Sequence, residues 1–138
     1  MKYTSIFIIT LFAYSNVNAQ TIPLSKASNN AKVYIISPTN GESVKEKFIV
    51  KFGLQGMGIA PAGVEYAFTG HHHLIIDGEI PNSKKPMGVE VIHFGKGQTQ
   101  TELKLSPGQH SLQLILGDFK HTPHDKPIIS EKITILVE

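Results

Sequence analysis

Residues 103–112, LKLSPGQHSL, hold two short apolar stretches separated by a proline–glycine pair. Before the pair, apolar and polar side chains alternate as in a half-buried β-strand. After it, Leu112 begins a second alternating series that continues with Leu114 and Leu116. Proline presets one turn angle and glycine adopts angles that other residues avoid, so the pair predicts a sharp change of direction. This stretch therefore predicts a strand, a corner and a second strand.

The same alternation, or a run of β-branched and aromatic residues, recurs along the chain between glycine- and proline-containing segments. The predicted strands cover residues 32–37, 47–52, 72–77, 89–94, 99–105, 110–116 and 128–137. A long glycine-rich loop is predicted over residues 53–70, and no segment has a sustained helical period. Short strands with turn signals between them predict an all-β protein, an antiparallel β-sandwich of about seven strands.

The corner at residues 103–112 is similar to the E–F corner of immunoglobulin-like and fibronectin-like domains. In those domains a tyrosine just after the turn hydrogen-bonds to the corner backbone. His110 stands in the place of that tyrosine, so we expect it to have a structural role. The resemblance makes the expected fold an immunoglobulin-like sandwich.

The N-terminus has the pattern of an export signal. Lys2 precedes an apolar run, and Val17 and Ala19 stand at the positions that signal peptidase reads. We therefore predict a cleaved signal peptide over residues 1–19, a flexible leader over 20–31 and the sandwich domain over 32–138. The apolar run is too short to span a bilayer, so no membrane span is expected after cleavage. The predicted location is periplasmic or secreted.

Composition narrows the possible functions. The chain has no arginine and its lysines are scattered, which argues against a nucleic-acid partner. It also has no cysteine, which excludes disulfides and thiol catalysis and fits a bacterial exported domain. Loss of Lys2 with the signal would lower the formal net charge from +2 to +1. No complete catalytic signature is present, so enzymatic activity is left open and a non-catalytic role is favoured.

Histidines are the most informative residues, and three of the seven are consecutive, at positions 71–73. In an antiparallel sandwich alternate loops meet at the same end, and this places six histidines, all except His110, at one pole. His71 and His73 share one face of their strand, with Cα atoms about 6.6 Å apart, whereas His72 faces the opposite way. The predicted metal ligands are His71, His73, His93, His121 and His124.

Neutral imidazole suits copper and zinc ions, so the sequence predicts a small exported domain that binds one of these transition metals through its histidine cluster. The metal ion is the expected partner, with another periplasmic protein as a second. The alternative is a non-catalytic module that binds a protein or glycan and whose histidines are structural. A cupin-like metalloenzyme is disfavoured, because Glu79 lies too far from the pair His71 and His73.

Several longer motifs point to one family. They are residues 33–41, 53–63 and 69–77, the triplet HFG at 93–95, PGQH at 107–110 and the stretch from 116 to 125. Together they resemble a bacterial exported family catalogued as domain of unknown function 4399. The resemblance covers nearly all of the chain after residue 19. It implies a small exported domain and assigns neither a reaction nor a ligand.

Overall fold

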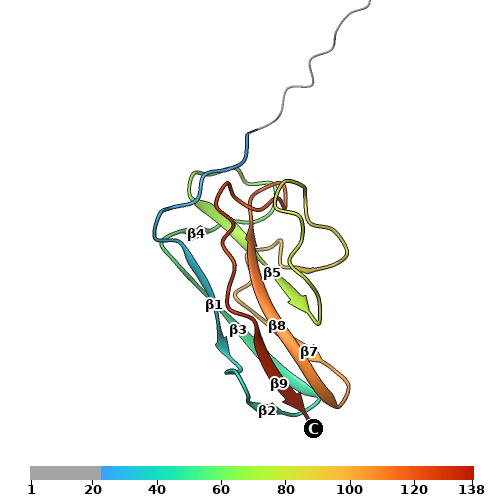
Figure 1. Cartoon of the computed structure of the whole chain (residues 1–138). Helices are drawn as coiled ribbons and strands as arrows, with labels where there is room; N and C mark the ends of the chain where they lie inside the picture. The colour runs from blue at the N-terminus through green and yellow to red at the C-terminus, as the bar shows by residue number, and fades with distance from the viewer. Residues whose placement is uncertain (1–22) are drawn as a thin grey trace, which may run out of the picture.

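The computed structural model describes residues 23–138, which form a sandwich of two β-sheets (Figure 1). The strands are β1 (Lys32–Ser37), β2 (Ser43–Val44), β3 (Lys47–Gln55), β4 (Gly58–Ile59), β5 (Thr69–Ile76), β6 (Ile92–His93), β7 (Gln100–Lys104), β8 (Gly108–Gly117) and β9 (Ile133–Val137). No helix among these residues is long and apolar enough to cross a membrane.

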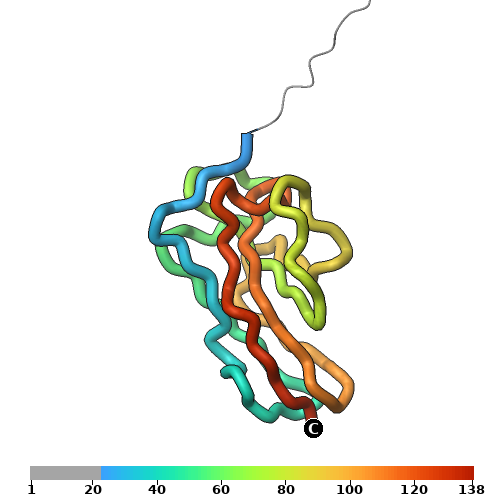
Figure 2. Tube along the Cα trace, in the orientation of Figure 1, coloured from blue at the N-terminus to red at the C-terminus, as the bar shows by residue number. Residues whose placement is uncertain are grey.

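The strand order is that of an immunoglobulin-like sandwich, which confirms the predicted fold. One sheet has the order β1-β3-β7, and the other has β2-β9-β8-β5-β4 with β6 paired to β5. β1 pairs antiparallel with β3, and β5 with β8, whereas the two-residue β2 pairs parallel with β9. The tube in Figure 2 shows β9 beside the first half of β8 in the lower part of the molecule.

Most predicted boundaries shift by one to three residues, and three of the changes are larger. The predicted strand 89–94 shrinks to the two residues of β6, because the residues before it form a loop. The predicted strand 128–137 is regular only in β9, although Ile129 still bridges Ile115 of β8. The start of the glycine-rich loop belongs to β3, and its middle contains β4.

The main core lies between the sheets and follows from strand alternation. Val50 and Phe52 of β3 meet Leu74 of β5 and Leu112 and Leu114 of β8, all of them buried. A second, smaller apolar cluster lies on the outer face of the larger sheet and consists of Ile75, Met87, Val91 and Ile115, with Ile129 packed against it. The loop between β5 and β6 thus covers part of that outer face.

The N-terminal residues that the structure describes contact the loop after β8. Ser25 Oγ donates to Asp118 Oδ2 over 2.7 Å, and Asp125 N donates to the Ser25 carbonyl over 2.9 Å. Asp125 Oδ1 also accepts from Ala27 N, and Lys26 pairs with the same carboxylate. Residues 25–27 are therefore bound to the loop after β8. The predicted signal peptide, residues 1–19, lies outside the described residues.

The corner histidine lies where the sequence predicted. His110 Nε2 donates to the Ser106 carbonyl over 2.9 Å, and its Nδ1 donates to Asp77 Oδ2 over 2.6 Å. The Asp77 carboxylate was not foreseen, and it also accepts from Ser111 N through Oδ1 over 2.7 Å. Because both partners of the ring accept hydrogen bonds, both bonds form together only when His110 is protonated.

These bonds set the direction of two pKa shifts. The Asp77 carboxylate and the Ser106 carbonyl raise the pKa of His110 above 6.5. Partial burial opposes ionisation of Asp77, but the hydrogen bonds from Ser111 and His110 outweigh it and lower the pKa of Asp77 below 3.8. The His110 contribution to stability is therefore complete below about pH 6.5 and is lost as pH rises through the folded-state pKa. The Asp77 contribution is complete above about pH 3.9 and is lost on acidification.

We predict that His110→Gln lowers the free energy of unfolding more at pH 5.5 than at pH 9. At pH 5.5 both charges are present, whereas at pH 9 the native imidazole has already lost its proton. Urea unfolding of the parent and the variant at the two pH values measures the difference, and Asp77→Asn should give the same pattern. An equal loss at both pH values would show that the ion pair does not stabilise the corner.

Candidate metal site

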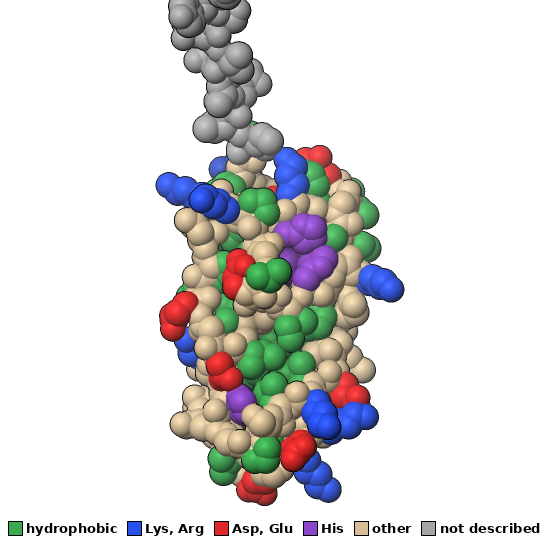
Figure 3. All heavy atoms as spheres, turned by 90° about the vertical axis from the view of Figure 1, so that its right-hand side faces the viewer, with side chains coloured by type: hydrophobic (Ala, Val, Ile, Leu, Met, Phe, Trp, Pro, Cys, Tyr) green, Lys and Arg blue, Asp and Glu red, His purple; other side chains and the backbone are tan. Residues whose placement is uncertain are grey.

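Imidazole rings from three parts of the chain converge on the outer face of the larger sheet. The strand β5 and its neighbour β6 contribute three of the rings, and the loop after β8 contributes the fourth. Ring centroids lie between 4.3 Å, for His93 and His121, and 6.0 Å, for His73 and His121. In Figure 3 histidine side chains gather at one place on the surface. This imidazole cluster consists of His71, His73, His93 and His121.

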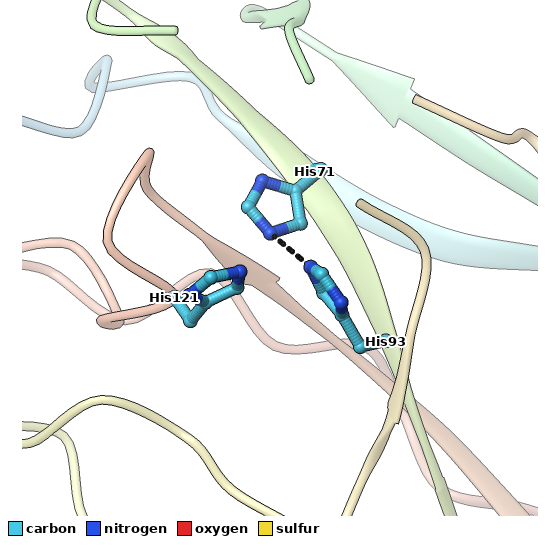
Figure 4. Close-up of side chains that lie close together, drawn as sticks. All are labelled: His71, His93 and His121. Carbon is cyan, nitrogen blue, oxygen red and sulfur yellow. Dashed lines mark hydrogen bonds between the residues drawn. The ribbon is translucent and has the colours of Figure 1, made fainter. Parts of the chain in front are cut away.

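The nitrogen atoms lie close enough to share one ion. One ligand nitrogen each from His71, His93 and His121 lies within 4.8 Å of the other two. The Nε2 atoms of His71 and His93 are 3.1 Å apart, as the dashed line in Figure 4 marks. Two nitrogens bound to a tetrahedral ion at zinc–imidazole distances lie about 3.3 Å apart. Small side-chain rotations therefore bring the three rings to coordination distance.

Burial leaves several of these nitrogens without a partner. His73 has both ring nitrogens buried and without a hydrogen bond within residues 23–138, and the same holds for His71 Nδ1. Both rings are almost fully buried, at 0% exposure for His71 and 1% for His73. A buried nitrogen without a partner destabilises a fold by about 1–3 kcal/mol. The nitrogens of neutral imidazoles are also common ligands of metal ions.

The two buried rings of the cluster, His71 and His73, are neutral at pH 7. Burial, with the neighbouring rings as a smaller cause, lowers the pKa of His71 to about 4 and that of His73 to about 3. Burial and then His121 also lower the pKa of His93. Neutral imidazole is the form that binds metal ions, so these rings need not lose a proton first.

His121 reaches the cluster from an uncommon backbone conformation. Its φ angle is 63°, in the left-handed region that few residues other than glycine adopt. Two hydrogen bonds hold it there, from His121 N to the Asp118 carbonyl at 2.9 Å and from Met87 N to the His121 carbonyl at 2.8 Å. Strained residues of this kind concentrate at functional sites, which supports a role for this side chain.

The Asp118 carboxylate organises the loop that carries His121. Its Oδ1 accepts from Lys120 N at 2.9 Å and Thr122 N at 3.0 Å, and its Oδ2 accepts from Ser25 Oγ at 2.7 Å. These bonds go to the backbone and to Ser25, not to an imidazole ring. Asp118 therefore holds the loop through its backbone and does not contact a ring.

A glycine of β8 leaves room for the rings. Gly117 lies opposite His71 in the β5–β8 register. A Cβ atom at Gly117 would come within 2.6 Å of His73 Cε1 and 2.8 Å of Met87 Cε, closer than real Cβ contacts. The outer face of β8 is therefore flat at this point, and the imidazoles occupy the space.

The structure brings together four of the five predicted ligands. His124 does not join them, because its Nε2 donates to the Thr69 carbonyl over 3.1 Å at the start of β5. The buried residues Thr122 and Pro123, the latter bridged to Gly117, turn His124 away from the ring of His121. The cluster also lies on the outer face of a sheet rather than among the loops of a pole.

The other two histidines are placed as expected. His72 faces the core, with its ring centroid 5.1 Å from that of Phe52. His110 is at the corner before β8, bonded to Asp77 and Ser106. Sequence reasoning did not foresee that Met87 would border the cluster, because the loop that carries it has no periodicity from which its fold could be read.

Fold and site define an immunoglobulin-like β-sandwich with a histidine cluster on its outer face. The sequence of residues 50–138 matches the family described as domain of unknown function DUF4399. The chain belongs to this family, as its motifs suggested. The search of curated proteins finds no match.

Two solved structures share a similar arrangement of strands. An endo-β-1,4-mannanase from Thermotoga petrophila is 16% identical with a TM-score of 0.46, over 78% of this chain and 20% of the mannanase. The fibronectin(III)-like modules of Clostridium thermocellum CbhA are 14% identical with a TM-score of 0.42, over 77% of this chain and 95% of the module chain. This chain thus spans about a fifth of the mannanase's length.

We predict that Gly117→Ala destabilises the domain by about 1–3 kcal/mol, because the added methyl group overlaps His73 and Met87. Gly58→Ala is the matched control, since its Cβ would meet only a Thr69 methyl group at 3.3 Å. Thermal and urea unfolding measure both variants. Equal effects of the two substitutions would contradict the close packing at Gly117.

We also predict that Asp118→Ala lowers the free energy of unfolding by about 1–3 kcal/mol by leaving the amides of Lys120 and Thr122 without their acceptor. Ser25→Ala removes only the bond to Oδ2 and should cost less. Urea unfolding gives the free energies, and proton NMR of the histidine rings reports whether His121 moves. An unshifted His121 signal in Asp118→Ala would show that the loop keeps its conformation without the Asp118 carboxylate.

Proposed function

We propose that the domain binds a transition metal ion, copper or zinc, through the imidazole cluster. The observation that carries the proposal is His73, whose two ring nitrogens are buried and without a partner beside three other imidazoles. Among the described residues His73 is the histidine with both ring nitrogens buried and unpaired. His72 and His124 each leave one buried nitrogen unpaired, whereas both nitrogens of His110 have partners at the corner.

Access to the site supports the same function. His93 is exposed and His121 is half-buried, whereas His71 and His73 lie beneath them. An open pocket of about 270 Å³ lies over the cluster and is lined by three of its rings, with Met87, Gly88 and Val89 at the rim. An ion can therefore enter from solvent and leave again, as a protein that carries or buffers a metal requires.

Location is part of the proposal and rests on the sequence alone. The N-terminal pattern of Lys2, an apolar run and Ala19 favours export to the periplasm or the medium. A cysteine-free, all-imidazole site suits that oxidising space, because imidazole has no thiol to oxidise.

We predict stoichiometric binding of copper or zinc by the untagged, chelator-treated protein, measured by calorimetric titration at pH 7.5. Ligands from β5, β6 and the loop after β8 would link separate segments, so the metal should also raise thermal stability. At a hundredfold excess of metal over Kd the stabilisation is about 2.7 kcal/mol.

The decisive variants are His93→Gln and His121→Asn, since asparagine also adopts a left-handed backbone. His110→Gln is the matched control, because this histidine is bonded at the opposite corner. Both cluster variants should lose binding while the control binds as the parent does. Affinity weaker than about micromolar for every metal, or cluster variants that bind normally, would refute the proposal.

The alternative is a non-catalytic interaction module. It is favoured by Tyr66 and Phe68, which are 75% and 52% exposed and line a pocket of about 340 Å³ with Phe119. Exposed aromatic side chains of this kind bind proteins and glycans. This alternative becomes the better one if the titration shows no metal binding.

A further inference from the structure

We infer that the ion of this site is copper(I), and that the Met87 thioether joins the imidazoles as a ligand. This inference rests on the proposed function, because it names the ion that the same cluster binds. It depends on where Met87 lies and on the charge of the ligand set.

Met87 is built into the edge of the cluster. It is 8% exposed, and its amide donates to the carbonyl of His121 over 2.8 Å, which ties the β5–β6 loop to a ligand. A Cβ atom added at Gly117 would lie 2.8 Å from the Met87 methyl carbon and 2.6 Å from His73 Cε1. Met87 also lines the pocket together with His73, His93 and His121. The methyl end of the Met87 side chain and the His73 ring thus face the same point beside Gly117.

The chemistry of the thioether selects the ion. Soft sulfur ligands favour copper(I), whereas zinc sites are built from thiolate, imidazole and carboxylate. The chain has no cysteine, and its three methionines are Met1, Met57 and Met87. Met57 packs against the main core, so Met87 is the methionine of the described residues that borders the imidazoles.

Charge leads to the same ion. The imidazoles and the thioether are all neutral, so the charge of the bound ion is not cancelled by its ligands. Asp118 is the carboxylate that acts on the pKa of His71, which it raises. Its oxygens already accept hydrogen bonds from Ser25, Lys120 and Thr122, so it is not a free ligand for the ion. The cost of burying a charge rises with its square, so a divalent ion costs about four times as much as a monovalent one. A neutral ligand set thus supplies no negative charge that would offset the larger cost of a divalent ion.

The competing explanation for Met87 is packing. Met87 belongs to the small outer-face apolar cluster with Ile75, Val91 and Ile115. Leucine preserves volume and hydrophobicity and removes only the sulfur, so Met87→Leu separates the two explanations. Met57→Leu is the matched control for the same change in the main core.

The test is a competition for copper(I) against a chromophoric copper(I) chelator, under anaerobic conditions with ascorbate, with a zinc titration in parallel. The untagged protein should bind copper(I) more tightly than Zn²⁺. Met87→Leu should weaken copper(I) binding by about tenfold or more, which is about 1.4 kcal/mol, and leave zinc affinity unchanged. Met57→Leu should change neither. X-ray absorption of the copper-loaded protein should show a sulfur neighbour that is absent in Met87→Leu.

The outcomes separate this inference from the proposed function. If neither copper nor zinc binds, the proposed function fails. If metal binds but zinc is preferred, or Met87→Leu keeps its copper(I) affinity and its spectrum, the copper(I) inference is wrong and metal binding stands. If Met87→Leu weakens copper(I) and zinc equally, Met87 acts through packing and the assignment as a ligand is overturned.

Discussion

The candidate site depends on the alternation of side chains along β5, which is fixed by its pairing with β8. In that register Leu74 and His72 face the core, and His71 and His73 face outward beside Ile75. A shift of one residue would exchange the two faces and place two unpaired imidazoles in the main core. The leucines of β8 prevent that shift, because they need the apolar partners that β5 supplies in the observed register. The packing of the core thus determines which histidines can meet on the outer face.

Much of this arrangement was readable from the sequence. Alternation and turn residues identified the strands, and the corner before β8 identified the sandwich. The predicted strand order placed His71, His73, His93 and His121 near one another, but among the loops of a pole rather than on the outer face of a sheet. The place of His124 could not be read, because it depends on how a short loop folds. The position of Met87 could not be predicted either, because the loop between β5 and β6 is held by tertiary contacts such as the hydrogen bond from Met87 N to the His121 carbonyl. Local pattern predicts strands well and predicts irregular loops poorly.

The loop that carries His121 illustrates how distant segments combine at the site. Residues 25–27 bind its two carboxylates, Asp118 and Asp125, from one side. The backbone of Met87 binds the His121 carbonyl from the other side. Held between these contacts, His121 keeps a left-handed conformation that it would rarely adopt in a free loop. The N-terminal segment is therefore part of the site's support, although it supplies no ligand.

The buried imidazoles of the cluster are a local weakness that the rest of the fold must offset. Each buried, unpaired nitrogen of His71 and His73 costs about 1–3 kcal/mol, against a total stability of about 5–15 kcal/mol for a domain. The same burial lowers the pKa values of the two rings, which keeps them neutral and avoids repulsion among closely spaced imidazolium ions. Apolar side chains at these positions would fill the space without this cost. The buried imidazoles therefore lower the stability of the outer face, and the apolar core between the sheets must offset that loss.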